Sequence, residues 1–166
     1  MFTNVDGFPF FIGGQPQSVT DLHPSASQIF QLWQTYLDNV NPILKLIHAP
    51  SLQVQIIDAG ANLQKVSKSL EALMFSIYLM AITSLSNEEV EGTFGESRFN
   101  LLTKYHHGAQ QALFNAGFMR MPDLTVLQAY FLYLVRAFLA CLFFLLILTS
   151  ISLASGSIQT PERYSA

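Results

Sequence analysis

The adjacent pair His106-His107 is the place where this sequence comes closest to a metal-binding pattern. Neighbouring residues on a helix point about 100° apart, so these imidazoles cannot hold one ion as an i,i+4 pair can. No H-E-x-x-H arrangement surrounds them. We therefore expect a partly exposed helical pair and no metal ligands in this chain. The other two histidines, His23 and His48, stand close to prolines and are expected to be structural.

The segment Gly95-Glu96-Ser97-Arg98-Phe99 is close to the nucleophile elbow of the α/β-hydrolases. That elbow needs a glycine where Phe99 stands, because the strained turn crowds this position, and it needs a preceding strand. Here an acidic helix and a glycine come first. We expect Ser97 in the first turn of a helix, with Glu96 near the positive end of the helix dipole. No catalytic serine is predicted.

Other residues with chemical potential have simpler structural interpretations. Glu88, Glu89 and Glu91 have no apolar pocket around them to raise a pKa, so they indicate a solvated helix start. Gly13-Gly14 is followed by no lysine of phosphate-loop form. The aromatic group of Phe30, Trp33 and Tyr36 has the spacing of a helical core face. We therefore predict no catalytic, cofactor-binding or metal-binding residue, and no enzyme.

The cysteine content and the charge argue against DNA binding by this chain alone. Cys141 is the single cysteine, whereas a zinc-cluster module needs six closely spaced cysteines to hold two zinc ions. The net charge is −3, and the eight basic residues are scattered, whereas a nucleic-acid surface needs clustered Lys and Arg. The first residues, MFTNVDGFPFFIGG, lack the features of a signal peptide.

The elements that position these residues are predicted to be helices. Residues 1–22 carry too many glycines and prolines for a regular element and indicate a flexible leader. Beyond them apolar residues recur at steps of three and four, and no long stretch alternates with period two. The sequence predicts an all-α, multi-helix bundle of about six helices. They run from Pro24 to Val40, Pro50 to Gly60, Ser67 or Ser69 to Ile82, Ser86 to Glu91, about Glu96 to Ala116, and Pro122 to Leu134.

Two of these helices have predicted inner faces. The helix through Leu70–Ile82 has a wide apolar face and is expected to be central to the core. The helix from Glu96 is expected to place Phe99, Leu102, Tyr105, Ala109, Ala112 and Leu113 inward, and Gly117 is expected to end it as a C-terminal cap.

The tail is more apolar than the rest. Ala137–Ala154 contains no charged residue and reaches the length of a candidate membrane span. Arg136, Glu162 and Arg163 are too few flanking charges to set an orientation. A polar tail follows at 155–166. This gives an apolar helix at 137–154 that is either a membrane span or a non-native tail.

Several blocks of the sequence together resemble a known family. They are HPSASQIFQLWQTYLDNVNPILKLIHAPSL at 23–52, SLEALMFSIYLMAITSLSNEE at 69–89 and FGESRFNLLTKYHHGAQQALFNAGF at 94–118, followed by LQAYFLYLV at 127–135. These blocks resemble the N-terminal part of the fungal-specific transcription factor regulatory domain, the middle homology region of zinc-cluster transcription factors. The resemblance runs through turns and polar positions and covers residues 23–136.

The resemblance implies a nuclear protein that regulates transcription by RNA polymerase II through protein partners, or through self-association. It implies that zinc and DNA contacts belong to a module absent here. Because family members continue with further soluble helices, the chain is expected to be truncated near Arg136. Faces such as Leu70–Ile82 and Leu127–Leu134 would then lack their covering helices. The alternative is a small single-span membrane protein with a helical cytosolic head.

Overall fold

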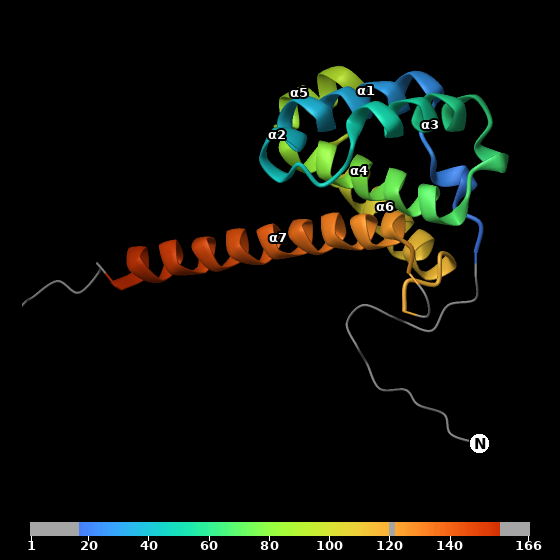
Figure 1. Cartoon of the computed structure of the whole chain (residues 1–166). Helices are drawn as coiled ribbons and strands as arrows, with labels where there is room; N and C mark the ends of the chain where they lie inside the picture. The colour runs from blue at the N-terminus through green and yellow to red at the C-terminus, as the bar shows by residue number, and fades with distance from the viewer. Residues whose placement is uncertain (1–16, 120–121, 157–166) are drawn as a thin grey trace, which may run out of the picture.

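Helices are the only regular elements in residues 17–119 and 122–156, the part of the chain that the computed structural model describes. This confirms the all-α bundle (Figure 1). The predicted leader at 1–22 and polar tail at 155–166 fall mostly outside the described residues. The described end of the leader is not flexible as predicted, because Val19 is buried in the core and Thr20–Leu22 form a short helix. The elements are η1 (Thr20–Leu22), α1 (Ala26–Asn39), α2 (Asn41–Leu44), α3 (Ala49–Ala61), η2 (Leu63–Lys65), α4 (Lys68–Ser84), α5 (Asn87–Phe94), α6 (Arg98–Asn115) and α7 (Leu124–Gly156).

Helix α4 forms the centre of the bundle. It packs against α1, α6 and α7, and α3 lies beside α1 on the outer side (Figure 1). All eleven residues from Ala72 to Ile82 are buried, so α4 is covered on every side and not along one stripe. The predicted central position of this helix is confirmed. The expectation that its face lacks covering helices is wrong, because α1, α6 and α7 of this chain already cover it.

Short polar side chains set the start of four helices. Ser25 and Ser86 each form a capping box, with Gln28 and Glu89 respectively. Ser67 and Ser97 accept hydrogen bonds from the backbone N–H three residues ahead. Such caps satisfy backbone donors that a helix leaves free at its first turn. The helix start predicted at Ser86 is confirmed, as is Ser67 among the two residues predicted to begin α4.

Several helix boundaries differ from the predicted ones. Helix α1 begins at Ala26 because Ser25 caps it, so Pro24 lies before the helix. Helix α1 ends at Asn39, close to the predicted end at Val40, and Asn41-Pro42 begins the separate helix α2, where proline suits the first turn. Helix α5 continues past Gly92 to Phe94, and Gly95 ends it at a positive φ of 70°. Gly117, at φ 67°, lies just beyond the C-cap of α6 in the predicted place.

The inner face of α6 differs at one position. Phe99 is 77% exposed, whereas Leu101 is buried beside Tyr105 and Ala109. The neighbouring Arg98 explains this rotation. Its guanidinium donates to the carbonyl oxygens of Ile82 and Thr83, at 3.2 and 2.9 Å, and so closes the C-terminal end of α4. With Arg98 turned toward α4, Phe99 points about 100° away, into solvent.

Helix α7 is one continuous element, with no break between 136 and 137. Its packed face consists of Val126, Ala129, Leu132 and Tyr133. Apart from Ala129, the apolar residues that led us to predict a helix here are exposed. They are Leu124, Leu127, Phe131 and Leu134. The helix is apolar on nearly all sides, so periodicity alone could not identify the packed face.

We expect Gly108→Ala to destabilise the fold. An added Cβ would lie 2.6 Å from two ring carbons of Phe75, which is fully buried between α4 and α6. Overpacking of this kind costs about 1–3 kcal/mol, more than the ~1 kcal/mol that alanine gains over glycine in a helix. Chemical denaturation of the purified chain should show a lower midpoint.

The matched control is Gly92→Ala, on α5, where a Cβ meets no atom within 4 Å. It should leave the midpoint unchanged or raise it. Equal midpoints for the two variants would contradict the close approach of α4 and α6.

Candidate functional site

Ser97 and Glu89 occupy capping positions. The Ser97 hydroxyl oxygen accepts from the backbone N–H of Asn100 at 3.3 Å and so begins α6. Glu89 accepts from the backbone N–H of Ser86 at 2.8 Å, and this hydrogen bond lowers the pKa of the Glu89 carboxyl. Both arrangements stabilise helix starts. The structure places no histidine in hydrogen-bond contact with Ser97.

The two adjacent histidines have different environments, as expected for neighbours on a helix. His107 is exposed, whereas His106 is half-buried and stacks on the ring of Tyr133 at 5.4 Å. Burial, followed by the charge of Arg136, lowers the pKa of His106. Across residues 17–119 and 122–156, no three His, Cys, Asp or Glu side chains gather as a metal site would require.

A buried polar cluster, not predicted from the sequence, lies where the N-terminal segment meets α4. His23 Nδ1 lies 3.3 Å from the hydroxyl of Tyr78, and its Nε2 lies 3.6 Å from a carboxylate oxygen of Glu71. The imidazole also packs on Phe75, with ring centroids 4.4 Å apart. Burial, and then the neighbouring Tyr105 and Glu71, raise the pKa of Tyr78 well above its usual value.

This cluster connects the chain before α1 to the central helix. Glu71 and Tyr78 lie 48 and 55 residues after His23 in the sequence, and no local pattern brings His23 next to Tyr78. The only sequence signal was a histidine before Pro24, which indicated a turn. Nε2 of His23 makes no hydrogen bond within the described part of the chain. The polar contacts of His23 hold the N-terminal segment to α4, and they include no serine or cysteine that could act as a nucleophile.

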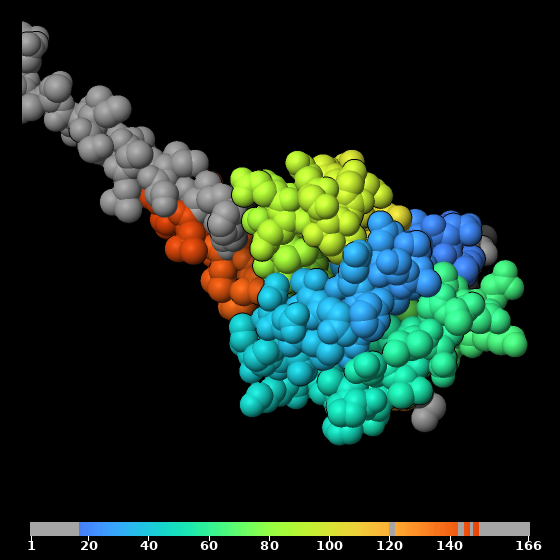
Figure 2. Space-filling model, turned by 90° about the horizontal axis from the view of Figure 1, so that it is seen from above, coloured from blue at the N-terminus to red at the C-terminus, as the bar shows by residue number. Residues whose placement is uncertain are grey.

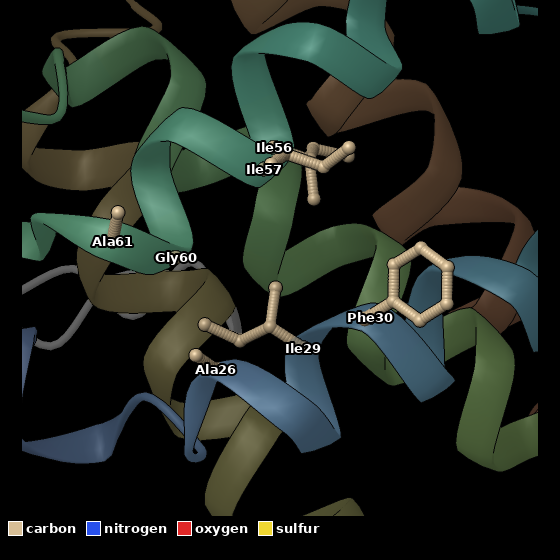
Figure 3. Close-up of a pocket in the computed structure, with 7 residues that line it drawn as sticks. All are labelled: Ala26, Ile29, Phe30, Ile56, Ile57, Gly60 and Ala61. Atoms are coloured by element: carbon tan, nitrogen blue, oxygen red, sulfur yellow. The ribbon is translucent and has the colours of Figure 1, made fainter.

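Two shallow apolar grooves open on the body. The first lies between α1 and α3, has a volume of about 230 Å³, and is shown in Figure 3. It is lined by Ala26, Ile29, Phe30, Ile56, Ile57, Gly60 and Ala61. The second, of about 300 Å³, lies where α2 and the end of α4 meet α7. Neither is lined by a charged residue, so both suit apolar groups and not phosphates or metal ions.

The solvent side of α7 is an extended surface of exposed apolar side chains. This helix extends well past the other helices (Figure 1). Figure 2, in which the molecule is seen from above, shows the end of the helix projecting from the body. Along it Leu124, Phe131, Phe138, Leu145 and other large apolar side chains are exposed. Exposed apolar surface of this extent is typical of a contact surface for protein or lipid. The residues Leu124–Leu142, with mean hydropathy 1.6, are long and apolar enough to cross a membrane, and 22% of them are buried in the fold.

The chain is homologous to part of several fungal transcription regulators. It is 47% identical over 125 residues to the transcriptional regulator AacuB of Aspergillus aculeatus and 46% identical over 125 residues to the transcriptional regulator nsrM of Aspergillus novofumigatus. It is 32% identical over 107 residues to the C6 finger domain transcription factor adaR of Aspergillus niger. These matches cover 74%, 74% and 63% of this chain.

The chain spans less than a fifth of the length of these curated relatives, at 17%, 18% and 14%. No protein-family model matches it. No solved structure matches it either. The comparisons therefore relate this helical segment to a part of fungal transcription regulators.

We expect Ser97 to act as a helix cap and not as a nucleophile. Ser97→Ala should lower the free energy of unfolding by about 0.5–2 kcal/mol, the usual cost of a lost cap. Ser97→Asp should preserve stability, because aspartate caps equally well. A fluorophosphonate probe should not label the unmodified chain, and stoichiometric labelling at Ser97 would contradict the assignment.

Asp123 should make the fold sensitive to acid. Its carboxylate accepts from the Ser69 hydroxyl at 2.7 Å and from the backbone N–H of Val126 at 2.8 Å, and these bonds lower its pKa in that order. A lowered pKa stabilises the fold above the ordinary value of 3.8, and this contribution is lost as the pH falls through the lower, folded value.

Asp123→Asn keeps a capping oxygen but does not titrate. Urea denaturation at a series of pH values should therefore show a smaller loss of stability below about pH 3.8 for this variant than for the unmodified chain. Parallel curves for the two proteins would rule out a contribution from Asp123.

Proposed function

We propose that this chain is the N-terminal part of the regulatory domain of a fungal zinc-cluster transcription factor and that it regulates transcription by RNA polymerase II. The observation that carries the proposal is the 46–47% identity to two fungal regulators along three quarters of the chain. The all-helical fold fits a domain that works through packing. The domain proper occupies residues 23–136, between a leader at 1–22 and the apolar segment at 137–154.

In this role the chain performs no reaction. It regulates by presenting or covering helix faces to protein partners, which shifts a packing equilibrium. The interlocked arrangement of α1, α4 and α6 supports such a mechanism, because a fully packed core changes state as a unit. The polar residues of the described part are used as caps and ties between helices, as a regulatory scaffold would use them.

DNA recognition would belong to a separate module. A zinc cluster requires six cysteines, and the 166 residues contain one, with a net charge of −3. Zinc and the DNA contacts would therefore lie outside this segment, and the protein would act in the nucleus. A relative named for its C6 finger supports this division of roles.

A second candidate is a small membrane protein with a single span and a helical cytosolic head. It is favoured by one observation, the apolar length of α7 around Leu124–Leu142 and on through Ala154. Carbonate extraction of a tagged chain from fungal membranes separates the two candidates. Release into the supernatant supports the regulatory domain, and retention in the pellet supports the span.

The proposed function is tested by exchange of segments. The 125 matching residues of AacuB are replaced by those of this chain, and transcripts of the genes that depend on the regulator are measured. We expect transcript levels within about threefold of the unmodified regulator, because the segments share nearly half of their residues and small surface differences cost little stability.

Two glycine variants serve as controls in the chimera. Gly92→Ala, in open space, should keep transcript levels, whereas Gly108→Ala, against Phe75, should reduce them. If the unmodified chimera accumulates in the nucleus but supports no transcription, the proposal is wrong.

A further inference from the structure

The solvent side of α7 carries a regular heptad pattern. The residues Leu124, Leu127, Phe131, Leu134, Phe138, Cys141, Leu145 and Leu148 follow one another at steps of three and four, alternating without interruption. Each of them is exposed. We name these eight residues the α7 seam. An apolar repeat that holds this alternation for three and a half heptads suits a helix that supercoils around another helix. Leu139, Leu142 and Leu146 are exposed beside it.

The seam faces away from the body of the protein. At 100° per residue, its residues cluster on one side of α7. The centre of this cluster lies roughly 150° around the axis from the centre of the packed face, which consists of Val126, Ala129, Leu132 and Tyr133. Gln128 fixes this rotation, because its amide donates to the carbonyl oxygen of Leu46 at 2.9 Å. The body therefore leaves the full length of the seam open to a second helix.

We propose that the α7 seam pairs with the seam of a second copy of this chain, with the two helices antiparallel. The seam is symmetric about Arg136, so reversal of the partner places each seam residue opposite another. The resulting layers, each written with the partner's residue second, are 124 with 148, 127 with 145, 131 with 141, and 134 with 138. Each layer joins the first apolar heptad position of one helix to the second of the other.

The volumes of these layers favour the antiparallel arrangement. Phe131 meets the small Cys141 of the other copy, and Phe138 meets Leu134, so large and small side chains alternate across the seam. A parallel pair would instead place Phe131 on Phe131 and Phe138 on Phe138, with Cys141 facing Cys141. Antiparallel pairing also brings the part of α7 beyond the body (Figure 1) against the first turns of the partner's α7.

The seam is large enough to hold a dimer. It runs over 25 residues, or about 37 Å at 1.5 Å per residue. A buried phenylalanine covers roughly 150–250 Å². The two phenylalanines of the seam, with its five leucines and Cys141, form a surface that approaches the ~800 Å² per partner of a stable interface. No charged residue occupies the seam, so pairing would leave no charge buried within it.

A membrane is the competing occupant, and it fits the first half of α7 less well. Insertion of Leu124–Leu142 would pull Val126, Ala129 and Leu132 out of the core. It would also break the hydrogen bond from Gln110 to the Tyr133 hydroxyl, at 2.9 Å. Pairing along the seam leaves all of these contacts in place.

The test measures the oligomeric state of the complete 166-residue chain by sedimentation equilibrium. Phe138→Glu replaces a seam residue that is 64% exposed, and it should raise the dimer dissociation constant about 100-fold or more, because two carboxylates would be buried without partners. Ala140→Glu introduces the same charge two residues away, on the opposite side of the helix, and should leave the constant within about threefold.

Cysteine cross-linking tests the direction of pairing. Under copper–phenanthroline oxidation the unmodified chain should form little disulfide dimer, because Cys141 faces Phe131 of the other copy. Phe131→Cys should form it rapidly through 131–141 bonds. Rapid cross-linking of the unmodified chain would indicate parallel helices and overturn the proposal.

Flotation with phosphatidylcholine vesicles tests the competing occupant. Lipid binding that Phe138→Glu and Ala140→Glu weaken equally, with a monomer in solution, would also overturn the proposal. The inference does not depend on a role in transcription, so its failure and that of the proposed function are separate results.

Discussion

The burial of α4 on every side is the constraint on which the rest of this structure depends. A helix with no solvent-facing stripe needs neighbours around its whole circumference, and α1, α6 and α7 supply them. This requirement explains why residue 108 is a glycine. Helix α6 approaches Phe75 of α4 so closely there that a Cβ on residue 108 would collide with the phenylalanine ring. It also explains why the first turns of α7 belong to the bundle although the rest of α7 leaves it.

Polar contacts then fix how the surrounding helices are rotated about this core. Arg98 links the start of α6 to the end of α4, and Asp123 links the start of α7 to Ser69 at the start of α4. Apolar packing is largely non-directional, whereas these hydrogen bonds have defined partners. The same residues that look like candidates for chemistry therefore serve to select one packing among several of similar apolar area.

The sequence was sufficient for the fold class, the central helix and most helix starts, because serine caps and glycine ends are local signals. It was insufficient where the decisive contact is distant. Phe99 was predicted to be buried but is exposed, because Arg98 next to it bonds to Ile82. These two residues are sixteen positions apart, so no local pattern reveals the bond. The cluster around His23 was missed for the same reason. On α7, apolar residues on all sides hid the packed face, which distant hydrogen bonds such as those from Gln128 to Leu46 and from Gln110 to Tyr133 distinguish.

The exposed residues of α7 acquire a meaning only once its packed face is known. Before that, Leu124, Phe131 and Leu134 are indistinguishable from core residues, and the segment from Ala137 is indistinguishable from a membrane span. With Val126, Ala129 and Tyr133 assigned to the body, the exposed apolar residues include the eight of the seam, with Leu139, Leu142 and Leu146 beside them toward the C-terminal end. A lipid environment selects for overall apolarity and needs no regular spacing, whereas a partner helix selects for position. The packing of Val126, Ala129 and Leu132 in the bundle, with a seam whose spacing suits a partner helix, therefore favours a protein contact over insertion of the whole of α7 into a membrane.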